Sequence, residues 1–224
     1  MPSVAAEGKH LRSRPRPFLH RTKTYQEFPD GSDVRATIDR SHLETLRVKV
    51  ARMQHRLLFV CLGNICRSPT AESIFRALVE EAKLSAHFTL DSAGTGGWHV
   101  GEPPDRRMRA AGQRRGYSIA GRARQVRRDD FAHFDWLVAM DRENAAALRA
   151  LAATETERAQ VVLLRDFERQ VGHLMNGDDL EHLDGLDVPD PYYGGPSGFD
   201  DVVTIVERCC RNLLQHLQES ERNR

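Results

Sequence analysis

The chain has 224 residues, enough for one domain with a substantial core and an appended segment. Its formal net charge of +1 argues against nucleic acid or a membrane surface as partner, and no apolar run is long enough to predict a transmembrane helix. No charged segment followed by an apolar one opens the chain, so we expect no secretory signal. The four cysteines, Cys61, Cys66, Cys209 and Cys210, do not form a secreted disulfide framework and favour a reducing, cytoplasmic compartment.

Residues 1–55 differ in composition from the rest of the chain. The stretch HLRSRPRPFLHRTK is basic and interrupted by prolines, and the polar residues after it contain one short helical pattern near 41–52. We therefore expect a poorly ordered N-terminal extension at 1–55 that is dispensable for chemistry. A single domain at 56–218 and a polar tail at 219–224 complete the predicted organisation.

From residue 56 onward, short apolar runs alternate with amphipathic stretches. The run LLFVC at 57–61 predicts a strand covered on both faces. Ser68 and Pro69 then predict a helix start, with Ser68 as the N-cap and Pro69 in the first turn. The alternation predicts an α/β fold with a four-stranded parallel sheet flanked by helices. The later predicted elements are a strand at 88–94, a helix at 103–116, a strand at 134–140, a helix at 141–151, a strand at 161–167 and a helix at about 199–217.

The turn between the first strand and its helix has the composition of an anion-binding loop. Helix N-termini present unpaired backbone N–H groups, and Gly63 lets the backbone approach a ligand closely. The planar guanidinium of Arg67 can bind two phosphate oxygens at once. The Gly-Lys-Ser/Thr signature of nucleotide-binding loops does not occur here. The turn therefore predicts a cradle for an oxyanion.

Cys61 stands at the carboxyl end of the first strand, where open α/β sheets bind their ligands. The field that holds an anion also stabilises a thiolate, and thiol pKa values in such settings fall to roughly 3.5–7.5. We therefore expect Cys61 to attack the phosphorus of a bound phosphate ester and form a thiophosphate. Two thiols at this spacing do not make a zinc site, so we expect neither a metal nor a cofactor.

The stretch CLGNICRSPTAE resembles the signature of the low-molecular-weight protein tyrosine phosphatases, in which a cysteine, five residues, an arginine and a serine follow one another. Two further stretches, DSAGTGGWHVGEPPD and DPYYGG, resemble the active-site wall and the general-acid loop of that family. The resemblance covers about 56–218. It implies a three-layer, flavodoxin-like fold with the phosphate-binding loop after the first strand, and protein-tyrosine-phosphatase activity.

The resemblance also implies individual roles. Cys61 would be the nucleophile, Arg67 would bind phosphate and stabilise the transition state, and Asp190 would be the general acid and base. Asp141 would cap a helix and support the active-site network. The remaining site residues divide into loop support (Leu62, Gly63, Asn64, Ile65, Cys66, Ser68 and Ser92) and substrate wall (Trp98, Tyr192 and Tyr193).

The family resemblance implies a redox role for Cys66, which would form a reversible disulfide with Cys61 and protect it from peroxide. From the residue type alone, a role for Cys66 as a buried core side chain is as well supported as a role in the site. Cys209 and Cys210 fall in the last predicted helix and are expected to pack in the core. The resemblance also suggests Tyr192 and Tyr193, which we expect beside the active site, as candidates for phosphorylation.

Three alternative functions remain open from the sequence. Protein arginine phosphatases resemble a version of this loop with a threonine in place of Ile65, so Ile65 favours phosphotyrosine. Arsenate reductases of this architecture use two further cysteines in the middle of the chain, and none lies between Cys66 and Cys209. A phosphotyrosine-binding protein without turnover would lack Cys61 or Asp190.

Expected partners are phosphotyrosine-containing proteins or small aryl phosphates, with a cognate tyrosine kinase as a candidate. The stretch from about 165 to 188 is longer than the compact family pattern, which leaves substrate range open.

Overall fold

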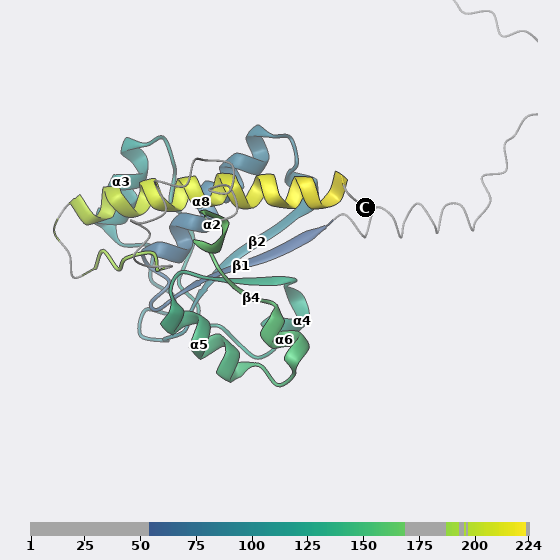
Figure 1. The fold of residues 1–224 in the computed structure, drawn as a ribbon. Helices are drawn as coiled ribbons and strands as arrows, with labels where there is room; N and C mark the ends of the chain where they lie inside the picture. The colour runs from purple at the N-terminus through teal and green to yellow at the C-terminus, as the bar shows by residue number, and fades with distance from the viewer. Residues whose placement is uncertain (1–53, 169–186, 193–194, 196, 223–224) are drawn as a thin grey trace, which may run out of the picture.

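The central sheet is four-stranded and entirely parallel, with the strand order β2-β1-β3-β4 (Figure 1). This is a computed structural model, and it describes residues 54–168, 187–192, 195 and 197–222. This is the strand order of a flavodoxin-like sheet, in which the first strand lies between the second and the third. The strands are β1 (His55–Cys61), β2 (Phe88–Gly94), β3 (Trp136–Ala139) and β4 (Val161–Leu163).

β1 is covered on both faces, which explains its continuous apolar sequence. Alternate residues of β1 enter two separate core clusters, with Phe59 in one and Val60 in the other, and both are fully buried. The register pairs Cys61 with Gly94, so β1 and β2 end together at one edge of the sheet. The first strand therefore delivers Cys61 to the carboxyl edge, where the sheet opens towards the loops.

Helices lie on both faces of the sheet and complete three layers (Figure 1). The helices α2 and α8 pack against each other and, with α3, cover the face that carries Phe59. The other face, which carries Val60, is covered by the shorter helices α4 and α5, with α6 beside them. The predicted fold class is confirmed. The helices are α2 (Arg67–Glu81), the 3-10 turn η1 (Ser85–His87), α3 (Arg106–Arg114), α4 (Asp130–His133), α5 (Arg142–Leu151), α6 (Glu155–Ala159) and α8 (Ser197–Arg222).

The predicted N-cap of the first helix is wrong. α2 begins at Arg67, Cys66 takes the N-cap position, and no side chain caps this end. The Ser68 hydroxyl is fully buried and lies 3.0 Å from the Cys61 sulfur, so it serves the loop rather than the helix end. Pro69 still fits the first turn, because the N–H that it lacks has no partner within the helix.

Other element boundaries differ from the predicted ones for local reasons. β4 ends at Leu163, where the backbone N–H donates to the Asp166 carboxylate at 3.2 Å, and residues 166–168 are helical. α8 continues to Arg222 because apolar residues recur on its inner face as far as Leu217 and polar residues extend it. The short helices α4 and α6 and the turn η1 were not predicted from the sequence.

Some predictions fall on residues that the structure does not describe. These are residues 1–53 of the extension predicted at 1–55, with its expected helix near 41–52, most of the stretch 165–188, and Tyr193. His55, at the end of the predicted extension, is instead the first residue of β1. Within the described part of the chain, no helix combines the length and apolar character that crossing a membrane requires.

Candidate active site

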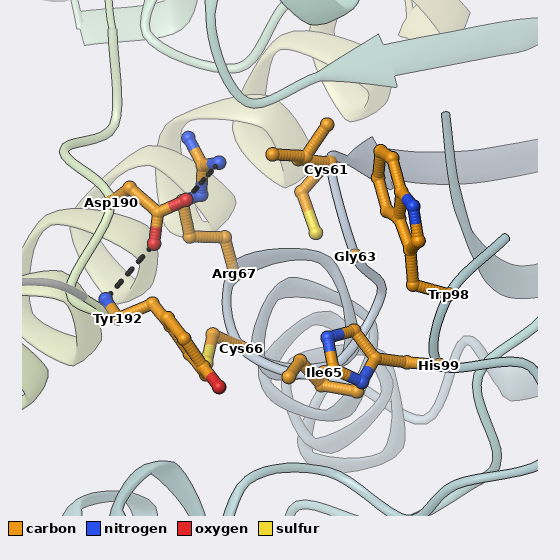
Figure 2. A pocket seen from close by; sticks show the side chains of 10 residues that line it. Cys61, Gly63, Ile65, Cys66, Arg67, Trp98, His99, Asp190 and Tyr192 are labelled. Carbon is orange, nitrogen blue, oxygen red and sulfur yellow. Dashed lines mark hydrogen bonds and ion pairs between the residues drawn. The ribbon is translucent and has the colours of Figure 1, made fainter. Parts of the chain in front are cut away.

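The loop between β1 and α2 forms the floor of a cavity of about 300 Å³ (Figure 2). Residues from three separate stretches surround it: the loop itself, the segment after β2, and the segment before α8. The structure therefore brings together most of the site residues predicted from the sequence. The lining residues are Cys61, Leu62, Gly63, Ile65, Cys66, Arg67, Trp98, His99, Asp190 and Tyr192.

Asn64 fixes the shape of the loop. Its backbone is in the left-handed region, with φ of 54°, a conformation that asparagine adopts more readily than most residues. Its buried side-chain amide donates to Ser68 Oγ at 2.9 Å and to Ser92 Oγ at 3.0 Å, and its Oδ1 accepts from the Arg124 backbone N–H at 2.9 Å. All three polar functions of one side chain thus tie the loop to α2, to β2 and to the segment after α3.

Two hydrogen-bonding groups converge on the sulfur of Cys61. The backbone N–H of Asn64 donates to Sγ at 3.3 Å, and the Ser68 hydroxyl lies 3.0 Å away. The same hydroxyl accepts from Asn64 and also lies within donating distance of the Ala93 carbonyl, at 3.2 Å. Hydrogen bonds of this kind stabilise negative charge on a sulfur that is almost fully buried.

Arg67 is buried in the cavity wall and is held by two carboxylates, Asp141 and Asp190. Figure 2 shows the contact with Asp190. One terminal nitrogen donates to Asp141 at 2.5 Å and to the Val188 carbonyl at 3.1 Å, and the other donates to Asp190 Oδ2 at 2.8 Å. Burial lowers the pKa of Arg67, but Cys61, Asp190 and Asp141 together raise it above its ordinary value. The guanidinium is therefore a permanent positive charge beside the sulfur.

The two carboxylates come from loops that are distant in sequence. Asp141 caps α5, because its Oδ1 accepts the Asn144 backbone N–H at 2.6 Å while its other oxygen binds Arg67. Asp190 is one-third exposed at the cavity mouth, and its Oδ1 accepts the backbone N–H of Tyr192 at 3.0 Å. Asp190 therefore has access to both the cavity and water.

Aromatic side chains rim the cavity, as predicted for Trp98 and Tyr192. Trp98 is 74% exposed, and its ring lies against Gly96, where an added Cβ would be 1.8 Å from a ring carbon. His99 also lines the cavity and was not predicted. Its Nδ1 lies 2.8 Å from Glu102 Oε2, and its ring centroid is 6.4 Å from that of Tyr192. Its position directly after the predicted wall residue Trp98 was the available signal.

Cys66 lines the cavity as a second thiol. Burial, followed by the charge of Asp105, raises the pKa of the Cys66 thiol to about 12. The Cys66 thiol therefore remains protonated at neutral pH, whereas a nucleophilic cysteine reacts as the thiolate. Cys209 and Cys210 are fully buried in α8, as predicted, and all four cysteines are free thiols. In the part of the chain that the structure describes, no three His, Cys, Asp or Glu side chains gather as metal ligands would.

Comparison with known proteins gives the family. The model of the low molecular weight phosphotyrosine protein phosphatases matches residues 56–223. The chain belongs to this family. A low molecular weight protein-tyrosine-phosphatase of Streptomyces coelicolor is 45% identical to this phosphatase over 172 residues, which cover 77% of this chain and 99% of that relative.

Solved structures agree with this assignment. A protein tyrosine phosphatase of Entamoeba histolytica, crystallised with Hepes in the active site, superposes on this phosphatase with a TM-score of 0.66 at 38% identity, covering 75% of this chain and 99% of that one. A Drosophila arginine phosphatase superposes with a TM-score of 0.61 at 31% identity, covering 71% of this chain and 96% of that one. The family fold thus serves proteins named for different phosphorylated residues.

Proposed function

We propose that this phosphatase hydrolyses phosphotyrosine through a phosphate ester of Cys61. Family membership makes the chain a protein-tyrosine-phosphatase, a hydrolase of phosphoric monoesters. The observation that supports the residue roles is that the proposed nucleophile, the phosphate-binding arginine and the general acid lie together at one cavity. Cys61, Arg67 and Asp190 line the same cavity, Asn64 and Ser68 lie within hydrogen-bonding distance of the Cys61 sulfur, and Arg67 donates to Asp190.

The first step transfers the phosphoryl group to sulfur. The phosphate oxygens bind the backbone N–H groups of the loop and the Arg67 guanidinium, which stabilise the charge that the equatorial oxygens carry in the transition state. The Cys61 thiolate attacks phosphorus, the bond to the phenolic oxygen breaks, and Asp190 donates a proton to that oxygen. The bound phosphate displaces Asp190 from Arg67, and the freed carboxylate takes up from water the proton that it then donates to the phenolic oxygen.

The second step returns the enzyme to its starting state. A water molecule enters from the side that the phenol has left and attacks phosphorus. Asp190, now a carboxylate, accepts a proton from this water. The bond between phosphorus and sulfur breaks, inorganic phosphate leaves, and the Cys61 thiolate recovers its hydrogen bonds with Asn64 and Ser68. Asp141 keeps its place beside Arg67 throughout, because its position as the α5 cap does not depend on the ligand.

The rim of the cavity supports a phosphotyrosine side chain in a protein or peptide, or a small aryl phosphate, as substrate. Among the described residues, the exposed large hydrophobic side chains are Leu62, Trp98, Val100 and Tyr192, and all except Val100 line the cavity. Val100 stands two residues after Trp98 on the same segment. A flat phenyl ring entering the cavity can pack between aromatic faces.

The alternative substrate, phosphoarginine, depends on Ile65. The Ile65 side chain lines the cavity, and it offers a guanidinium only apolar contact where a hydroxyl would offer a hydrogen bond. This favours phosphotyrosine over phosphoarginine. Because the fold is also that of a Drosophila arginine phosphatase, phosphoarginine is the substrate against which phosphotyrosine should be compared.

Steady-state kinetics on paired phosphotyrosine and phosphoarginine peptides, without added metal, tests the proposal. We expect phosphotyrosine turnover that Cys61→Ser abolishes and Asp190→Asn reduces by a factor on the order of 10² or more. Ile65→Thr serves as the matched variant and should raise phosphoarginine turnover relative to phosphotyrosine. Preference of the unaltered protein for phosphoarginine, or full turnover by Cys61→Ser, would contradict the proposal.

We further propose a cytoplasmic location and an accessory role for residues 1–55. The four free thiols support the location, because reducing compartments keep such thiols unpaired. The family model begins at residue 56, which supports the extension as a segment outside the chemistry. A protein lacking residues 1–53 should retain the kcat of the full chain on a small aryl phosphate, and loss of kcat would contradict this.

A further inference from the structure

Arg107 connects the phosphate-binding loop to the acid-bearing segment, although it does not line the cavity. The guanidinium carbon of Arg107 lies 5.2 Å from the ring centroid of Tyr192 and 4.6 Å from that of Phe199. These are distances at which a guanidinium is attracted to an aromatic face. Tyr192 follows Asp190 closely, and Phe199 is buried in the first turns of α8. One side chain of α3 thus contacts both ends of the segment between Asp190 and α8.

The Arg107 guanidinium is itself held in one orientation. Its Nε donates to Asp105 Oδ1 at 3.1 Å and a terminal nitrogen donates to Asp105 Oδ2 at 2.9 Å. Asp105 also caps α3, and its backbone N–H donates to the Ile65 carbonyl at 2.8 Å. The position of the guanidinium therefore follows that of the phosphate-binding loop.

The same contacts extend to the general acid. The Tyr192 backbone N–H donates to Asp190 Oδ1 at 3.0 Å, so the place of Tyr192 determines where this carboxylate oxygen lies. Arg67 also holds Asp190, through its Oδ2. A bound phosphate would occupy Arg67, and the contact through Arg107 and Tyr192 does not involve Arg67. This second connection to Asp190 is therefore independent of the Arg67 contact.

We propose that Arg107 is a positioning residue that places Asp190, through Tyr192, over the leaving-group oxygen. The inference rests on the proposed function of Asp190 as general acid. Removing Arg107 would therefore slow proton donation and leave the attack by Cys61 intact. Reactions whose leaving group departs without a proton would be spared, and reactions that require the proton would not.

The test compares kcat/KM for two aryl phosphates, one with a strongly basic leaving group (phenyl phosphate) and one with a weakly basic leaving group (2,4-dinitrophenyl phosphate). For Arg107→Met we expect a loss of about tenfold on phenyl phosphate and less than about twofold on the dinitrophenyl ester. Arg107→Lys keeps the charge but loses the paired hydrogen bonds with Asp105, and it should fall between Arg107→Met and the unaltered protein. It also serves where Arg107→Met fails to fold.

Arg114→Met is the matched control, because Arg114 lies on the same helix and binds Asp200 of α8 at 2.7 Å. It should leave both kcat/KM values unchanged. In an Asp190→Asn background, Arg107→Met should cause little further loss on phenyl phosphate, since the two residues act on one step.

Equal losses of Arg107→Met on both esters, or additive losses in the double variant, would overturn the inference, as would unchanged kinetics. None of these results would affect the proposed function. The proposed function would fail on different results: turnover by Cys61→Ser, or a loss of kcat/KM in Asp190→Asn that is the same for both esters.

Discussion

Replacement of Asn64 tests whether hydrogen bonds of one side chain hold the phosphate-binding loop. Asn64→Ala removes the bonds to Ser68 Oγ, to Ser92 Oγ and from the Arg124 N–H. At about 1 kcal/mol for each net hydrogen bond, the loss is about 3 kcal/mol. The left-handed backbone adds about 1 kcal/mol for alanine. Asn64→Gly avoids that strain but gains entropy in the unfolded chain by a similar amount, so the two variants should be destabilised about equally.

Urea and thermal unfolding measure the effect. For a domain of this size, a loss of 3–4 kcal/mol corresponds to a fall in Tm of about 10 °C. The kcat on phenyl phosphate should fall in both variants as well, because the Ser68 hydroxyl loses the donor that orients it towards Cys61. A destabilisation below about 1 kcal/mol in both variants would refute the role of the network. A large loss confined to Asn64→Ala would show that backbone strain, rather than hydrogen bonding, dominates.

Three further predictions concern other parts of the molecule. Cys66→Ala should keep kcat within about twofold but lose recovery by thiol reductant after peroxide inactivation, because no second thiol then lines the cavity with Cys61; full recovery would contradict the redox role. Gly96→Ala places a methyl group where the Trp98 ring lies, so KM for phosphotyrosine peptides should rise while Tm changes little, and an unchanged KM would contradict the role of this wall. Burial raises the pKa of Glu168, but ion pairs with two arginines outweigh it and lower that pKa below 4.5. Its stabilisation is therefore present above pH 4.5 and lost as pH falls through the lowered pKa, so unfolding curves of Glu168→Gln should depend less on pH below 4.5 than those of the unaltered protein.

The local part of the site was predictable because it is contiguous in sequence. A buried strand, a glycine-containing turn and a helix start fall within 57–69, so Cys61 and Arg67 flank one loop in any fold that contains these elements. The sheet was predictable for a similar reason, since strands buried on both faces have continuous apolar sequences. The prediction of Ser68 as N-cap failed because it considered only the unpaired N–H groups at the helix start. In the structure the Ser68 hydroxyl instead lies next to the buried sulfur of Cys61.

Contacts between distant segments were not predictable from the sequence. The pairing of Arg67 with Asp141 joins residues far apart in the chain, and only the parallel order of β1 and β3 brings them together. The backbone N–H of Arg124, which binds the Asn64 side chain, carries no signal of its role, because every residue but proline has such a group. The contact of Arg107 with Tyr192 likewise depends on how α3 packs against α8.

Trapping the covalent intermediate tests the central claim most directly. Asp190→Asn protein is mixed with a dinitrophenyl phosphate ester, which forms the intermediate without proton donation, and the reaction is quenched in acid within milliseconds. Because the variant lacks the base for the second step, intact-protein mass spectrometry should show one added phosphoryl group, and peptide mapping should place it on Cys61. The same experiment with Cys61→Ser should show none. A phosphoryl group on another residue, or steady turnover by the Cys61→Ser protein, would contradict the mechanism.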